Sequence, residues 1–144
     1  MTRSSMSISG GCLCGAVRYE ISGEPITMRV CWCKDCQRLA AGNGSANLLF
    51  RRDAVKITGN PATFSKPADS GNIIDRKFCA ACGTQLFGET AARPDFIVVR
   101  AGTLDDSSIF KPVANIWTSS APAWACMNDS IPRHERQAPP PTSK

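Results

Sequence analysis

The sequence predicts a mostly β fold with little helix, built from many short strands and stapled by zinc. Short apolar runs recur along the chain, and Gly, Pro or Asn residues break them, which is typical of strands joined by turns. No segment carries the sustained period of a long amphipathic helix. At 144 residues the chain has the length of one domain with a moderate core, which bound metal ions would help to stabilise.

The strongest local signals are alternation of apolar and polar residues and apolar runs that end at turns. In the first predicted strand, Val17, Tyr19 and Ile21 should face the core. The run at residues 96–100 is the most apolar and should be a central, buried strand. Residues 37–41 are typical of one or two helical turns. The predicted strands cover residues 16–21, 26–30, 47–50, 55–58, 63–65, 73–78, 83–87, 96–100 and 115–117.

Seven of the eight cysteines lie in closely spaced motifs that are typical of metal ligands. Three thiols within six residues follow a predicted strand, and zinc is the usual ion for such soft ligands. A second motif is split between a C-x-C pair near the start of the chain and a C-x-x-C pair at the tip of a predicted hairpin. The first set is Cys31, Cys33 and Cys36, and the second set is Cys12, Cys14, Cys79 and Cys82.

The two sets predict two different zinc sites. Four cysteines fill the coordination of a tetrahedral zinc, so the set of four predicts a structural ion. Three cysteines leave one position for water or a substrate atom, so Cys31, Cys33 and Cys36 predict an open and potentially catalytic ion. The alternative is a second structural zinc, completed by Cys126 or by an inert water. A lone cysteine such as Cys126 is more often a buried, small hydrophobic residue.

Composition and charge favour a cytoplasmic protein that binds neither specific nucleic acid nor a membrane. No apolar run approaches the length of a transmembrane helix, and residues 1–10 lack the apolar region of a secretory signal. In a reducing compartment, clustered cysteines bind metal more often than they form disulfides. The net charge is +5, but outside residues 1–10 and 131–144 there are thirteen basic and eleven acidic residues, too scattered for a nucleic-acid surface.

His134 is the only histidine, and its place near the C-terminus makes us expect that it is neither a ligand nor a base.

The expected domain organisation follows from the composition of the two ends of the chain. We expect three parts: a disordered leader over residues 1–7, a single zinc-binding domain over residues 8–130, and a disordered, proline-rich tail over residues 131–144.

Four further residues are candidates for roles near the sites. Trp117 and Trp124 are expected in the core or in the wall of a pocket. Lys34 and Asp35 lie between the predicted ligands of the open zinc. Either could steer a proton, but a solvated loop charge is the more ordinary interpretation.

Several blocks, in the same order, resemble the glutathione-dependent formaldehyde-activating enzyme family, which includes the vertebrate centromere protein V. The resemblance implies a β-tent fold of small antiparallel sheets with two zinc ions, one on the set of four cysteines and one on the set of three. Asn115 stands where many members have a histidine. The matching blocks are residues 11–19, 31–38, 78–84, 101–106 and 116–124.

The resemblance also implies an activity, a carbon–sulfur lyase of the S-(hydroxymethyl)glutathione synthase type. We therefore expect a zinc-dependent enzyme that adds a thiol such as glutathione to formaldehyde or another small carbonyl. A thiol at the open zinc would be deprotonated and could attack the carbonyl carbon. The alternative is a non-catalytic zinc module that binds a protein or nucleic acid through its exposed strands.

Overall fold

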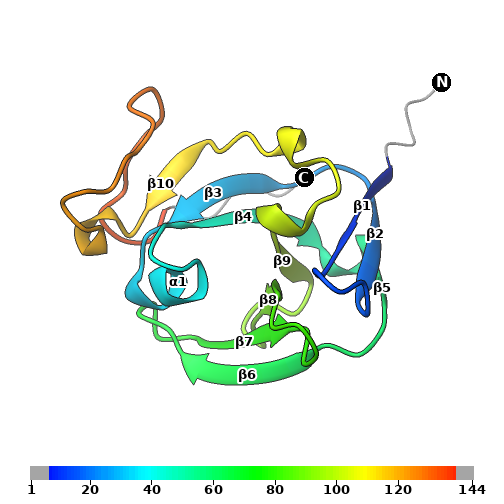
Figure 1. The fold of residues 1–144 in the computed structure, drawn as a ribbon. Coiled ribbons are helices and arrows are strands. Elements are labelled where there is room, and N and C mark those ends of the chain that lie inside the picture. Colours follow the sequence, from blue (N-terminus) through cyan, green and yellow to red (C-terminus); the bar gives the residue numbers. More distant parts are fainter. Residues whose placement is uncertain (1–6, 139–144) are drawn as a thin grey trace.

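The computed structural model describes residues 7–138, which form two β-sheets, one short α-helix and four 3-10 turns (Figure 1). The smaller sheet is antiparallel, in the order β1-β2-β5. The larger sheet has the order β10-β3-β4-β9-β8-β7-β6 and bends from β3 and β4 to β6 and β7, with α1 on its open side. The strands are β1 Ser7–Gly11, β2 Arg18–Ser22, β3 Thr27–Cys31, β4 Ser45–Arg51, β5 Val55–Thr58, β6 Ala62–Pro67, β7 Ile73–Phe78, β8 Gln85–Glu89, β9 Phe96–Arg100 and β10 Ala114–Ile116.

The predicted mostly β fold is confirmed, and the predicted strands fall on observed ones. β9 lies at the centre of the larger sheet, as its apolar run indicated. Two features differ from a set of small antiparallel sheets. The larger sheet has seven strands, and β10 pairs with β3 in parallel. β1 was not predicted, because its sequence Ser-Ile-Ser-Gly-Gly holds one apolar side chain and no alternation.

The main hydrophobic core joins the two sheets. Val17, Tyr19 and Ile21 are each at most 2% exposed, which confirms the face predicted from their alternation. The ring of Tyr19 meets that of Phe87 in β8 edge to face, with 5.4 Å between centroids. The Tyr19 hydroxyl shares a 2.7 Å hydrogen bond with Thr103, and burial raises the pKa of Tyr19 to about 12. Burying each such side chain contributes about 1.5–3 kcal/mol, so this core fixes one sheet against the other.

The chain returns to β10 after a long loop. The backbone N–H of Asn115 donates to the carbonyl of Pro132, and the N–H of His134 donates to the carbonyl of Asn115, both at 2.9 Å. The N–H of Trp117 donates to the carbonyl of Arg136 at 3.0 Å. The structure therefore differs from the disordered tail that we expected to begin at residue 131, because these residues pair with the edge of the larger sheet.

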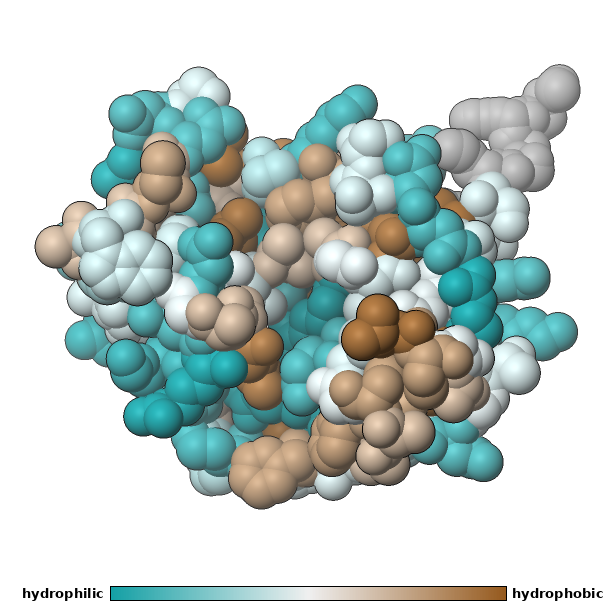
Figure 2. All heavy atoms as spheres, viewed as in Figure 1, coloured by the Kyte–Doolittle hydropathy of each residue, from teal (hydrophilic) through white to brown (hydrophobic). Residues whose placement is uncertain are grey.

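Trp124 and Cys126 do not lie where the sequence suggested. Trp124 is 69% exposed instead of being in the core or a pocket wall, and Cys126 is exposed instead of buried. Both belong to the loop that follows β10, and this loop contributes no strand to either sheet. On the face in Figure 2, hydrophilic residues predominate and hydrophobic ones form separate groups between them.

The ends of the chain are described only in part. Within residues 7–138, no helix is long and apolar enough to cross a membrane. The predictions of a disordered leader and tail also concern residues 1–6 and 139–144, which lie outside the described residues.

Candidate metal centres

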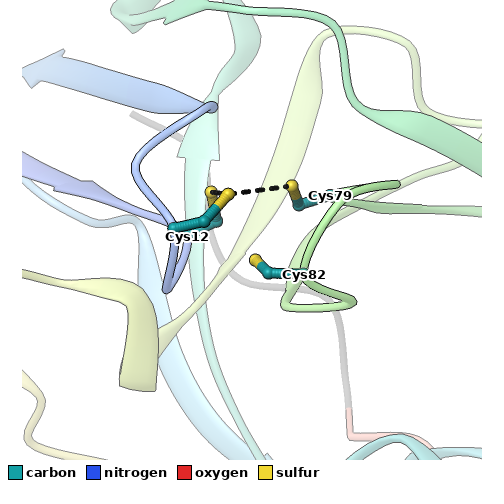
Figure 3. Close-up of side chains that lie close together, drawn as sticks. Cys12, Cys79 and Cys82 are labelled. Atoms are coloured by element: carbon teal, nitrogen blue, oxygen red, sulfur yellow. Dashed lines mark hydrogen bonds between the residues drawn. The ribbon is translucent and has the colours of Figure 1, made fainter.

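The first candidate centre, the four-cysteine cluster, consists of Cys12, Cys14, Cys79 and Cys82. Its two halves come from the loop after β1 and from the β7–β8 turn, and Figure 3 shows Cys12, Cys79 and Cys82 converging. All four Sγ atoms lie within 4.8 Å of one another, and two of the pairs are 3.7 Å apart. Sulfurs bound to one tetrahedral zinc at about 2.3 Å would be about 3.8 Å apart. The donor set therefore fits zinc.

Glycine shapes both halves of this cluster. Gly15 and Gly83 each follow the second cysteine of their motif, and both have a left-handed backbone, with φ of 84° and 81°. A side chain would strain such a conformation, whereas glycine adopts it freely. The N–H of Gly83 donates to the carbonyl of Cys79 at 2.7 Å, and this closes the turn. The two loops thus bend so that both of their sulfurs point to one place.

Nearby donors favour the ionised form of two of these thiols. The backbone N–H of Val17 donates to Sγ of Cys12 at 3.3 Å and lowers the pKa of Cys12. The hydroxyl of Thr84 lies 3.2 Å from Sγ of Cys82 and lowers the pKa of Cys82 to about 5. The same hydroxyl accepts the N–H of Leu13 at 3.0 Å, so it also joins the two halves.

The second candidate centre, the three-cysteine cluster, consists of Cys31, Cys33 and Cys36. Cys31 ends β3, and Cys36 lies in the first turn of α1 Lys34–Leu39. The helix begins earlier than the predicted turns at 37–41, because Sγ of Cys33 caps it by accepting the N–H of Cys36 at 3.4 Å. The three Sγ atoms lie within 4.8 Å of one another, and each residue is 7% exposed.

The arrangement of this buried cluster is suited to a bound cation. Hydrogen bonds with Cys33 and Cys36 raise the pKa of Cys31, whereas hydrogen bonds with Cys31 and Cys36 lower the pKa of Cys33. Without a cation, ionisation of one thiol therefore opposes ionisation of its neighbours. Three soft donors at this spacing fit zinc. Among the described residues, no fourth cysteine, histidine or carboxylate joins the cluster, and the exposed Cys126 is not part of it.

A cavity of about 340 Å³ opens at the three-cysteine cluster. Trp117 forms part of its wall, as expected, and is held by a 3.1 Å hydrogen bond from its indole N–H to Gln137. Gln137 belongs to the segment that pairs with β10, so the C-terminal residues complete this wall. Apolar side chains of β9, including Phe96 and Val98, also line the cavity. A small molecule in this cavity would reach the three thiols.

Two arginines in this cavity were missed by the sequence interpretation. Arg76 in β7 is 5% exposed, and its Nη2 lies 3.5 Å from Asp35. Arg100 ends β9, and its Nη1 donates to Asn47 at 2.7 Å and to Ser45 at 3.2 Å. The available signal was alternation, because Arg76 lies on the same face of β7 as Ile74 and Phe78, and Arg100 lies on the same face of β9 as Phe96 and Val98.

Asp35 is an ion-pair partner, and not the solvated loop charge that we favoured. Its carboxylate accepts from Nζ of Lys66 at 3.0 Å, in addition to the contact with Arg76, and its side chain is 19% exposed. Asp35 thus links α1 to β6 and β7. Lys34 beside it is exposed, in agreement with a solvated charge.

Asn115 holds an aromatic side chain between two of the ligand candidates. It is 3% exposed, and its Oδ1 accepts the indole N–H of Trp32 at 3.0 Å. The backbone carbonyl of Trp32 accepts from the side-chain amide of Gln37 at 2.7 Å, and this amide also donates to the carbonyl of Ser120. The asparagine therefore has a structural role in positioning the segment between Cys31 and Cys33.

The fold and the site together define a mostly β protein with two cysteine clusters suited to zinc, one of which faces a cavity. Residues 7–120 match the model of the glutathione-dependent formaldehyde-activating enzyme family, and the chain belongs to this family. The resemblance found in the sequence motifs is thereby confirmed.

One similar protein agrees with this assignment, and a second is similar in fold. A Halomonas elongata protein, provisionally named a glutathione-dependent formaldehyde-activating enzyme, is 30% identical over 105 residues, which are 69% of this chain and 67% of the relative. The crystal structure of a Rhodobacter sphaeroides protein is similar with a TM-score of 0.53 and 19% identity, over 87% of this chain and 98% of that one. The second similarity concerns the fold alone.

Proposed function

We propose that this protein adds a small thiol, such as glutathione, to formaldehyde or another small carbonyl at a zinc ion held by the three-cysteine cluster. Membership of the family indicates glutathione-dependent formaldehyde activation in the coarse sense. The observation that carries the finer proposal is that the cluster opens into a cavity and has three protein donors among the described residues. A zinc with three protein ligands keeps a position for substrate.

Zinc bound there would keep the sulfur of the substrate thiol in its thiolate form at neutral pH. The residues of the chain supply the remaining requirements. Trp117 and side chains of β9 give the cavity an apolar wall. Arg76 and Arg100 bring positive charge to the wall of the same cavity.

The reaction forms one bond and moves one proton. The substrate sulfur attacks the carbonyl carbon, a C–S bond forms, and the π electrons move to the oxygen. The proton that the thiol loses is matched by the proton that the new alkoxide gains, so the product is a hemithioacetal. Reversal of this step is carbon–sulfur cleavage. Holding both reactants in one cavity lowers the entropic part of the barrier.

The four-cysteine cluster has a structural role in this proposal. Four thiolates complete a tetrahedral zinc and leave no position for substrate. The ion would tie the loop after β1 to the β7–β8 turn, and none of its four ligands lines the cavity that contains Trp117. Both clusters need reduced thiols, and we therefore place the protein in the cytoplasm.

Zinc counting and X-ray absorption on three forms of the protein test the proposal. The wild-type protein should hold close to two zinc ions, and adding glutathione should add a sulfur neighbour to one of them. Cys33→Ser should lose one zinc and the glutathione response but stay folded. Cys126→Ala is the matched control and should lose neither.

The same three forms of the protein should also differ in catalytic activity. NMR of a mixture of glutathione and formaldehyde should show faster exchange with the hemithioacetal in wild-type protein and in Cys126→Ala than in Cys33→Ser. Loss of the second zinc in Cys126→Ala would contradict the proposal. The proposal would also be contradicted if neither zinc of the wild-type protein gained a sulfur neighbour when glutathione was added. Either result would favour a non-catalytic zinc module.

A further inference from the structure

Arg76 and Arg100 carry donors that the described residues do not use. Both arginines line the cavity at the three-cysteine cluster. The Nε and Nη1 atoms of Arg76 and the Nε atom of Arg100 are buried and have no hydrogen-bond partner among the described residues. A buried guanidinium with unpaired donors is costly unless an anion or a polar ligand lies beside it. The cavity is therefore suited to bind a negatively charged group.

The carboxylates around the cavity do not fully balance the charge of these two arginines. Asp35 contacts Arg76 at 3.5 Å and Lys66 at 3.0 Å, so its single negative charge is shared between two cations. Glu89 in the cavity wall forms ion pairs with two other cations outside the cluster. Asp69 lies at the exposed edge of the cavity, where water screens its charge.

The three thiols of the cluster line the same cavity as the two arginines, and they would become negative on binding a metal ion. A zinc ion with three thiolates has a charge of −1, and a fourth thiolate brings the charge to −2. Such a charge in a buried cavity is unfavourable unless cations lie next to it. The two guanidinium groups carry a charge of +2, which would offset the −2 of the zinc and its four thiolates.

We propose that Arg76 and Arg100 are positioning residues that supply the positive charge needed to hold a fourth thiolate, that of the substrate, beside the three-cysteine cluster. This inference rests on the proposed function, because it requires an open metal at that cluster. The two arginines would stabilise the negative charge on the sulfur of the substrate and would not bind its carboxylates. Asp35 holds Arg76 in place through the contact with its Nη2.

The test uses cobalt(II)-substituted full-length protein, because the visible absorption of cobalt reports thiolate ligation without any turnover. Two thiols are titrated: 2-mercaptoethanol, which has no carboxylate, and glutathione, which has two. Arg76→Met and Arg100→Met should each weaken the binding of both thiols by about tenfold or more, and by similar factors. Arg76→Lys and Arg100→Lys keep the charge and should bind both thiols more tightly than the methionine variants.

Arg51→Met is the matched control, because Arg51 is exposed at the end of β4, and it should bind both thiols as the wild type does. Circular dichroism and the cobalt content of the four-cysteine cluster verify that each variant is folded. If a methionine variant does not fold, Arg76→Gln or Arg100→Gln takes its place. Wild-type affinity for 2-mercaptoethanol in the neutral variants would overturn the inference. Weakened binding of glutathione alone would overturn it too, since the arginines would then recognise carboxylates.

The two levels of failure are distinguishable. If neither thiol changes the cobalt spectrum of the wild-type protein, the proposed function fails and this inference fails with it. If both thiols bind equally well to the wild type and to the neutral variants, the inference alone fails.

Discussion

Replacing Cys82 with serine should destabilise the whole domain through the loss of one cross-link. The four-cysteine cluster joins two segments that are distant in the chain, since Cys14 and Cys79 are separated by 65 positions. A metal ion that binds both segments restricts the unfolded chain in the way that a disulfide does. Removing one of the four thiolates weakens that restriction, because metal binding and folding are coupled in such sites.

The magnitude follows from the length of the closed loop. A loop of 65 residues corresponds to a loop-closure contribution of about 4 kcal/mol at 25 °C. Domains of this size are stable by about 5–15 kcal/mol, so the loss is a large share of the total. At the usual unfolding entropy for a chain of this length, the melting temperature should fall by about 14 °C.

Thermal unfolding followed by circular dichroism, together with zinc counts, measures this effect. Wild-type protein treated with a strong chelator should show a decrease at least as large as that of Cys82→Ser. Cys126→Ser is the control, because Cys126 is exposed and outside both clusters, and its melting temperature should not change. A Cys82→Ser protein that keeps two zinc ions and melts with the wild type would refute the assignment of this cluster.

Two further predictions concern side chains outside the metal ligands. Asn115→Ala leaves the buried indole N–H of Trp32 without an acceptor, and it should lower the free energy of unfolding in urea by about 1–3 kcal/mol; an unchanged urea midpoint would contradict this role. The ion pair with Arg18 lowers the pKa of Asp105 to about 2. Because this pKa lies below the unfolded value of about 3.9, the stabilisation is complete above that value and is lost as the pH falls towards 2. Asp105→Asn should therefore have a lower urea midpoint than the wild type at neutral pH, and the difference should shrink in acid; a constant difference down to pH 2 would argue against the ion pair.

The sequence by itself determined the features that depend on neighbouring residues. Alternation over a few positions placed β2 and identified the buried side chains of Tyr19 and Ile21 in it and of Val17 just before it. The spacing of the cysteines separated the four-cysteine cluster from the three-cysteine cluster, because ligands of one ion must lie on tight turns. Both predictions use information carried within a short stretch of chain.

Tertiary structure alone decided how distant parts meet. Nothing near Arg76 or Arg100 in the sequence shows that both line one cavity with the three thiols, since they come from β7 and β9. In the same way, the pairing of β10 with both β3 and the C-terminal segment left Cys126 exposed on the loop between them. Whether a side chain is buried or forms an ion pair depends on strands that are distant in the sequence and adjacent in the fold. The local sequence does not specify which strands these are.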